Sequence, residues 1–200
     1  LSLHREFLVP TTTISDVVSL KVPVLERIKK LNLQRAYVGS HPLAGGEGGG
    51  FSASRDDLFA GSRVWMVADG APQESVQRVK AFWAAIGAQG TMVETAEHDA
   101  MMVWVSHLPQ ITANALALAL EKAGIERNDL GPGGTDMTRL AGSGPDMWKD
   151  LLEHAPSTLP GALETVEKAL GEIRTLVQED RGDEVANVMR RTKEWFGGAK

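Results

Sequence analysis

The chain has 200 residues, 42% hydrophobic and 24% charged, which is the ordinary balance of a globular protein with a sizeable core. Its net charge of -5 argues against a nucleic-acid partner, which would require a basic patch. The absence of cysteine excludes disulfides and thiolate chemistry, and with no signal peptide or bilayer-length apolar run we expect a cytoplasmic protein without a membrane partner.

The first half of the chain alternates short β-branched segments with helical patterns. Val76, Val79 and Trp83 recur on one helical face, and Gly87 is a suitable residue to end that helix. Strands and helices that alternate at these intervals favour a mostly parallel sheet. The expected strands cover 11–19, 35–40, 62–69 and 91–95, and the expected helices cover 25–31 and 73–86.

From Glu97 onward the pattern is helical. Residues 98–123 form one long apolar segment, which we expect Pro109 to kink, and a loop over 124–136 follows. Further helices are expected near 144–154, 159–180 and 183–196. The second of these three carries an apolar seam suited to another helix, from the same chain or a second subunit: Leu159, Leu163, Val166, Leu170, Ile173 and Val177. The expected fold class is α/β over 1–96 followed by all-α over 97–200.

A glycine-rich stretch, VGSHPLAGGEGGGF, occupies residues 38–51. Gly48, Gly50 and Ala53 match the dinucleotide fingerprint GxGxxA. We disfavour this interpretation, because the match lies nine residues after the strand end and no good helix start follows. His41 is expected directly after a strand, where α/β proteins bind ligands, and imidazole can accept a proton near neutral pH. From position alone, a catalytic role and a structural hydrogen bond that caps the strand are equally open.

The segment EHDAMMVWVSHLPQ, residues 97–110, places several polar side chains on an apolar helix. It has neither the ligand spacing of a metal site such as HExxH nor the GxSxG elbow of a serine hydrolase. We favour an interpretation in which these groups satisfy one another next to Pro109, with a binding role as the alternative. The polar side chains are His98, Asp99, Ser106, His107 and Gln110.

The segment GGTDMTRLAGSGPDMW, residues 133–148, carries Asp136 three residues before Arg139. The planar guanidinium of an arginine suits a carboxylate ligand, and a neighbouring aspartate can orient it. An exposed ion pair is the default explanation. Met147 and Trp148 fit a core better than a binding site.

Taken in order, these segments resemble the prephenate/arogenate dehydrogenase family of tyrosine biosynthesis. The motifs are SDVVSLK, GSHPLAGGEGGG with DLFAG after it, HDAMMVWVSHLPQ and GGTDMTRLAGSGPDMW, and the resemblance runs from about residue 9 to residue 155. It implies an oxidoreductase that oxidises prephenate or arogenate with NAD or NADP and releases carbon dioxide. It also implies an N-terminal Rossmann domain and a C-terminal helical domain that forms a homodimer.

The resemblance also implies roles for individual residues. His41 would accept the hydrogen bond of the substrate's ring hydroxyl, Ser19 would lie between that hydroxyl and the nicotinamide, and Arg139 would bind a substrate carboxylate. The other implied site residues are Glu47 and Asp136, which orient the arginine, Gln110, which reads the substrate side chain, and Pro42, on the cofactor side.

The sequence departs from the family pattern in places. Gly46 and Gly48 replace a hydroxyl residue and a lysine, and Val18 replaces a glycine. The GxGxxG unit that holds the pyrophosphate is not found in these 200 residues, so we expect an incomplete enzyme that binds the dinucleotide weakly by itself. Gln110 stands where several members carry histidine, and the choices between prephenate and arogenate and between NAD and NADP stay open. The alternatives are a non-catalytic dimeric protein that binds tyrosine or prephenate and, with less support, another hydroxyacid dehydrogenase.

Overall fold

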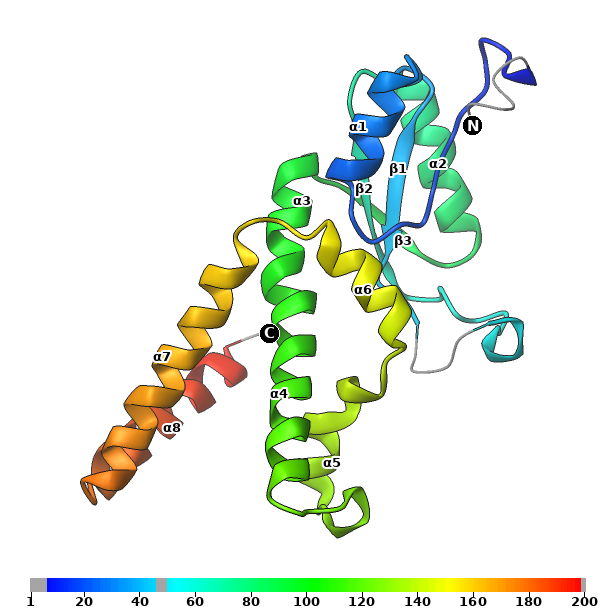
Figure 1. Cartoon of the computed structure of the whole chain (residues 1–200). Coiled ribbons are helices and arrows are strands. Elements are labelled where there is room, and N and C mark those ends of the chain that lie inside the picture. The colour runs from blue at the N-terminus through cyan, green and yellow to red at the C-terminus, as the bar shows by residue number, and fades with distance from the viewer. Residues whose placement is uncertain (1–6, 46–49, 199–200) are drawn as a thin grey trace. The chain divides into compact units, whose positions relative to one another are not determined.

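The computed structural model of the chain (Figure 1) describes residues 7–45 and 50–198. It divides into two compact units, Leu1–Ser157 and Thr158–Lys200. The first unit holds a sheet and the helices α1 to α6, and the second holds α7 and α8. The domain division near residue 96 that the sequence indicates lies within the first unit, where β3 is followed by helices alone in the described residues, and it stays a proposal.

The sheet has three strands in the order β1–β2–β3, formed by Val38–Pro42, Arg63–Ala68 and Gln89–Met92. β1 and β2 are antiparallel, whereas β2 and β3 are parallel, so the expectation of a mostly parallel sheet is wrong. The connections explain the difference. α2 (Gln73–Ala85) is the crossover helix that parallel β2 and β3 require, whereas the described part of the β1–β2 connection contains only a 3-10 turn, η2 (Phe51–Ala53).

The first strand is displaced from its predicted position. It begins three residues after the start of the predicted segment 35–40, and it continues to Pro42. His41 was expected directly after the strand, but it lies inside β1, opposite Trp65 of β2.

The strand expected over 11–19 is also wrong. Ile14 makes an isolated parallel bridge to Tyr37, and the rest of this segment has no ladder partner in the described structure. Its side chains bond to buried groups of the first unit: Ser15 Oγ lies 3.0 Å from Ser40 Oγ, and Asp16 accepts from the hydroxyl of Tyr37. These side-chain bonds hold the segment against β1 without a continuous ladder.

Most predicted helices are confirmed within a few residues. A loop was expected over 124–136, but a short helix, α5, begins within this segment and ends two residues after it. The proline does not prevent this helix, because Pro132 lies in the first helical turn, where its missing N–H costs nothing. The helices not yet given are α1 (Val22–Lys30), α3 (Thr95–Met102), α4 (Leu108–Lys122), α5 (Pro132–Thr138), α6 (Pro145–Glu153), α7 (Leu159–Gln178) and α8 (Gly182–Gly197).

The long helical segment around Pro109 is interrupted by a π-helical turn, Val103–His107, which joins α3 to α4. Proline has no N–H to donate, and its ring collides with the carbonyl group four residues earlier. The wider π-helical turn relieves that conflict directly before the proline, and α4 then begins with Pro109 in its first turn.

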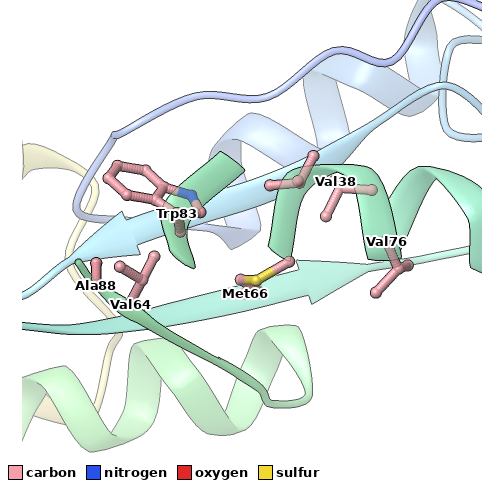
Figure 2. Packing of buried hydrophobic residues seen from close by; sticks show 7 residues of the cluster. Val38, Val64, Met66, Val76, Trp83 and Ala88 are labelled. Atoms are coloured by element: carbon pink, nitrogen blue, oxygen red, sulfur yellow. The ribbon is translucent and has the colours of Figure 1, made fainter. Parts of the chain in front are cut away.

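One buried hydrophobic cluster of the first unit lies between α2 and the sheet. Figure 2 shows Trp83 and Val76 of α2 facing Val38, Val64 and Met66 of β1 and β2. Trp83 is 3% exposed and the three sheet residues are fully buried. Each such side chain contributes about 1.5–3 kcal/mol on leaving water, so this cluster fixes the strand that carries His41.

The second unit is a pair of helices in mutual contact, α7 and α8. The C-terminal half of the apolar seam on α7 is exposed at Leu170 and Val177, and α8 exposes Trp195 and Phe196. Among the described residues, no helix is both long enough and apolar enough to cross a membrane.

Candidate functional site

The imidazole of His41 contacts a second histidine from a distant part of the chain. Its Nδ1 lies 2.9 Å from Nε2 of His98 on α3, and the two rings meet edge to face with centroids 5.1 Å apart. His98 is fully buried, whereas His41 is half-buried at the end of β1. The buried ring therefore supports the accessible one.

Asp99 holds the far side of His98. Nδ1 of His98 donates to Asp99 Oδ1 over 2.7 Å, and the carboxylate also accepts the backbone N–H groups of Lys21 at 2.8 Å and Val22 at 2.9 Å. Those N–H groups belong to the first turn of α1, where a carboxylate is stabilised by the helix dipole. Burial opposes the charge, but the hydrogen bonds from His98 and the backbone outweigh it and hold the pKa of Asp99 below its ordinary value.

A buried ion pair lies beneath the same end of β1. Lys21 is fully buried and pairs with Asp16, and its Nζ also donates to the carbonyl oxygen of Ser40 at 2.7 Å. The Asp16 carboxylate accepts from the hydroxyl of Tyr37 as well. Burial lowers the pKa of Lys21 even against the attraction of Asp16, which is the expected direction for a desolvated ammonium group.

These surroundings keep His41 neutral. Burial is the main cause, and the nearby His98 and the Lys21 ammonium add to it, so the pKa of His41 falls to about 4. A neutral imidazole has one nitrogen with a free lone pair. His41 can therefore accept a hydrogen bond or a proton at pH 7.

A cavity of about 580 Å³ begins at Leu43, two residues after His41 in the chain, and His41 itself is not among the described residues that line it. It is lined by Leu43 to Gly45 on one side and by residues of α4, α6 and the 3-10 turn η5 (Arg139–Gly142) on the other, including Gln110, Arg139 and Trp148. Arg139 is exposed at this wall. The indole Nε1 of Trp148 is buried and has no hydrogen-bond partner among the described residues.

Gln110 fixes the wall that carries the arginine. Its Nε2 donates to the carbonyl oxygen of Leu140 at 2.7 Å, and its Oε1 accepts from Ser143 Oγ at 3.2 Å. Gln110 is 4% exposed, so these bonds are shielded from water. The interpretation of segment 97–110 required Gln110 to bond to neighbours such as Ser106 or His107. Gln110 bonds to Leu140 and Ser143 instead, so that part of the interpretation is wrong.

Ser19 lies in a second cavity of about 300 Å³. This cavity has mainly apolar walls from Val18, Pro23 and Val24, and α6 closes it through residues that include Met147 and Leu151. Met147 lines both cavities, so Ser19 and Arg139 face spaces that share one wall. Met147 is exposed and Trp148 is half-buried, and their expected placement in the core is wrong.

The remaining predicted residues are less closely associated with the cavities. Pro42 is the last residue of β1 and pairs with Val64, and Asp136 lies on the exposed side of α5. Neither is among the described residues that line the two cavities. Glu47, like Gly46 and Gly48, lies outside the described residues. Gly50 has a φ of +76°, and the 3-10 turn after it is not a helix that could receive a phosphate, which agrees with disfavouring the GxGxxA interpretation here.

Sequence reasoning missed the buried pair of Asp16 and Lys21. Opposite charges five residues apart in a β-branched segment were the available signal, but their placement depends on tertiary contacts that bring Asp16 to Tyr37 and Lys21 to Ser40. It also gave no sign that His98 would meet His41, 57 residues away in the chain.

A small sheet with helices followed by a helical domain fits the expected fold class, a remnant of a Rossmann-type nucleotide-binding domain and a helical dimerisation domain. Two family models match in series: the nucleotide-binding domain of prephenate dehydrogenase over residues 1–92 and the prephenate dehydrogenase dimerization domain over residues 94–191. The chain belongs to the prephenate/arogenate dehydrogenase family, which confirms the resemblance that the motifs indicated.

Individual relatives agree with this assignment. The chain is 31% identical to cyclohexadienyl dehydrogenase of Zymomonas mobilis, over 85% of this chain and 60% of that protein. It is 26% identical to prephenate dehydrogenase of Bacillus subtilis, over 92% of this chain and 52% of that protein. The structure of Aquifex aeolicus prephenate dehydrogenase in complex with hydroxyphenyl propionate and NAD+ matches with a TM-score of 0.86 and 26% identity, over 98% of this chain and 70% of that chain. The chain thus spans little more than half the length of these two curated relatives.

Proposed function

We propose that this chain forms the substrate-binding and proton-accepting part of an NAD(P)-dependent oxidoreductase that converts prephenate or arogenate by oxidative decarboxylation. One observation carries the proposal: a neutral His41, fixed on its strand, stands two residues before the segment Leu43 to Gly45, which lines a cavity that Arg139 lines as well. A base next to the cavity in the chain and a cation in its lining suit a substrate with a ring hydroxyl at one end and a carboxylate at the other.

In this proposal His41 accepts the proton of the ring hydroxyl. A hydride leaves the ring carbon more readily as the hydroxyl on that carbon loses its proton, and a positioned base contributes about 10²–10⁴-fold. The pKa of about 4 keeps the imidazole unprotonated at neutral pH, although it also makes the imidazole a weaker base than free histidine. Loss of carbon dioxide leaves its electron pair in the ring, which becomes aromatic, and the phenol oxygen recovers the proton from His41.

Arg139 holds the other end of the substrate. Its guanidinium can bind a carboxylate through two parallel hydrogen bonds. The resemblance implies that Gln110 reads the substrate side chain. Its contacts support a different role, in which Gln110 positions Arg139 by bonding to the turn η5. The orienting roles of Glu47 and Asp136 and the contact of Pro42 with the cofactor stay predictions.

The residues present fit the nicotinamide end of the cofactor. The apolar cavity beside Ser19 can take a flat ring, and the Ser19 hydroxyl offers both a donor and an acceptor. NAD or NADP, when bound, supplies the acceptor for the hydride. Val18 and Pro23 would exclude water from that ring, and the Ser19 hydroxyl would orient it or the substrate hydroxyl.

We further propose that the chain forms a homodimer through its helical part. Support comes from the match to a dimerization domain over 94–191 and from the apolar side chains that α7 and α8 expose. Trp195 is 82% and Phe196 is 80% exposed, and large apolar side chains gathered on a helix pair are typical of an interface.

Turnover tests the proposed function. The chain, alone and extended upstream with any preceding residues its gene encodes, is given prephenate or arogenate with NAD+ or NADP+, and reduced nicotinamide and carbon dioxide are measured together. We expect equal amounts of both products from one of the two substrates. A preparation that binds a substrate and a dinucleotide but forms neither product would contradict the enzyme and favour a binding protein.

A further inference from the structure

Asp99, His98 and His41 are joined by two hydrogen bonds in series. The donor and the acceptor of each bond can be assigned in turn, starting from Asp99. Both backbone partners of the Asp99 carboxylate, the amides of Lys21 and Val22, are donors that cannot accept. The carboxylate is thus an acceptor throughout, and its pKa lies below the ordinary value. The ring nitrogen of His98 that contacts it, Nδ1, must therefore carry a hydrogen.

The state of His41 follows from that of His98. A neutral imidazole has one N–H and one lone pair, so with the hydrogen on Nδ1 the Nε2 atom of His98 can only accept. Its partner at 2.9 Å, Nδ1 of His41, must be the donor. The lone pair of His41 is then on Nε2, the one ring nitrogen that the histidine pair does not use.

We propose that Asp99 and His98 are positioning residues that fix His41 in its Nδ1–H tautomer, so that Nε2 of His41 is a dedicated acceptor for a hydroxyl donor. The identity of that donor, the ring hydroxyl of the substrate, rests on the proposed function, whereas the tautomer does not. An Nε2–H tautomer would present a hydrogen to the ligand and would favour a ring carbonyl over a ring hydroxyl. The series thus selects the reduced, hydroxyl form of the ring.

Burial makes this arrangement rigid. His98 and Asp99 are 0% and 3% exposed, so water does not compete for their hydrogen bonds. Reversing the series would require a second hydrogen on His98, which would place a positive charge on a fully buried ring. In the other tautomer of His41 the hydrogen would be on Nε2. Its Nδ1 lone pair would then face the Nε2 lone pair of His98 without a hydrogen between them.

Nitrogen NMR of the imidazoles tests the proposal without any substrate. The chain has five histidines, so single substitutions assign each ring, and long-range 15N–1H spectra at pH 8.5 report which nitrogen carries the hydrogen. We expect one tautomer for His41, with the hydrogen on Nδ1, and the same for His98. A wild-type spectrum with the hydrogen of His41 on Nε2 overturns the proposal.

Two substitutions of His98 separate positioning from packing. His98→Gln keeps a side-chain oxygen able to accept from His41 Nδ1 and should preserve the tautomer, whereas His98→Leu removes the acceptor and should produce a mixture. His107→Leu is the matched control, because it removes another buried imidazole of the same helical segment that does not bond to His41. A His41 ring that stays wholly Nδ1–H in His98→Leu contradicts the proposal, and if that variant does not fold, the wild-type spectrum still decides.

The ligand preference supplies the second measurement. By NMR titration, 4-hydroxyphenylpropionate should bind the wild-type chain at least 10-fold more tightly than 3-(4-oxocyclohexyl)propionate, which has a carbonyl at that position, and His98→Leu should narrow this ratio while His98→Gln preserves it. A ratio unchanged in His98→Leu contradicts the positioning role. If neither compound binds, the proposed function fails while the tautomer result is unaffected.

Discussion

The side-chain amide of Gln110 donates to the carbonyl of Leu140 over 2.7 Å, and this bond ties α4 to the turn that carries Arg139. The arginine itself is exposed, and the backbone of this turn sets where its side chain begins. Gln110 can thus influence the affinity for a carboxylate by holding the turn in place.

Gln110→Leu tests this tie. The substitution leaves the Leu140 carbonyl and the Ser143 hydroxyl without their partner, and we expect a loss of about 1–3 kcal/mol in the free energy of unfolding, with weaker carboxylate binding. Urea unfolding followed by tryptophan fluorescence measures the first and calorimetry the second. Ser106→Ala, at the wall of the same cavity, is the control and should leave both nearly unchanged. Equal effects of the two substitutions would show that Gln110 has no special role.

Asp99→Ala should be the most destabilising single change in the site. It removes the acceptor of two backbone N–H groups and one imidazole N–H, all in a place that water does not reach. We expect a cost of about 3–5 kcal/mol in the free energy of unfolding. Glu97→Ala, an exposed change on the same helix, should cost less than about 0.5 kcal/mol. A mild effect of Asp99→Ala would mean that the buried network is not formed in solution.

The lowered pKa of His41 predicts a specific acid sensitivity. Between pH 4 and pH 6.5 the unfolded chain binds a proton at this residue that the folded chain does not, so the free energy of unfolding falls as the pH falls through this window. His41 accounts for about 3 kcal/mol of this fall, because each pKa unit corresponds to about 1.4 kcal/mol. Burial lowers the pKa of His107 too, so part of the slope has another source.

Urea unfolding at a series of pH values isolates the contribution of His41. In His41→Asn the slope between pH 4 and pH 6.5 should be smaller by up to one proton, while stability above pH 7 varies little with pH. An unchanged slope would mean that His41 titrates normally in the folded chain.

The exposed apolar residues of α8 provide a test of the homodimer. Trp195→Glu should shift the mass in sedimentation equilibrium from dimer toward monomer, because a charge in an apolar interface is left without a partner. Lys193→Glu, an exposed change on the same helix, is the control for added negative charge. A dimer that survives both changes equally would place the interface elsewhere.

Patterns in the sequence predicted the elements better than their connections. The periodicity that includes Val76, Val79 and Trp83 located α2, and β-branched residues located β2, because each pattern reflects burial on one face of a single element. The direction of β1 depends on the path of residues 43–62, about which periodicity says nothing. The glycines of segment 124–136 suggested a loop, although α5 begins within it with a proline in its first turn.

The candidate site was predictable residue by residue but not as an arrangement. Motif order indicated His41, Ser19, Arg139 and Gln110, whereas the bond between His41 and His98 depends on how α3 packs against the sheet, where it contacts β2. The structure places Arg139 and Gln110 on one cavity and Ser19 on the next, and no single motif contains that information.

The central claim is that His41 and Arg139 recognise opposite ends of one ligand, and a set of truncated ligands tests it most directly. Affinities of 4-hydroxyphenylpropionate, 3-phenylpropionate and 4-ethylphenol are measured by calorimetry for the wild-type chain, His41→Leu and Arg139→Ala, with Arg127→Ala as an exposed control. We expect the wild type to bind the complete ligand at least 10-fold more tightly than either truncated one. His41→Leu should lose only the preference for the hydroxyl, and Arg139→Ala should lose only the preference for the carboxylate. Wild-type affinities that ignore both groups, or variants that lose both preferences together, would contradict the account.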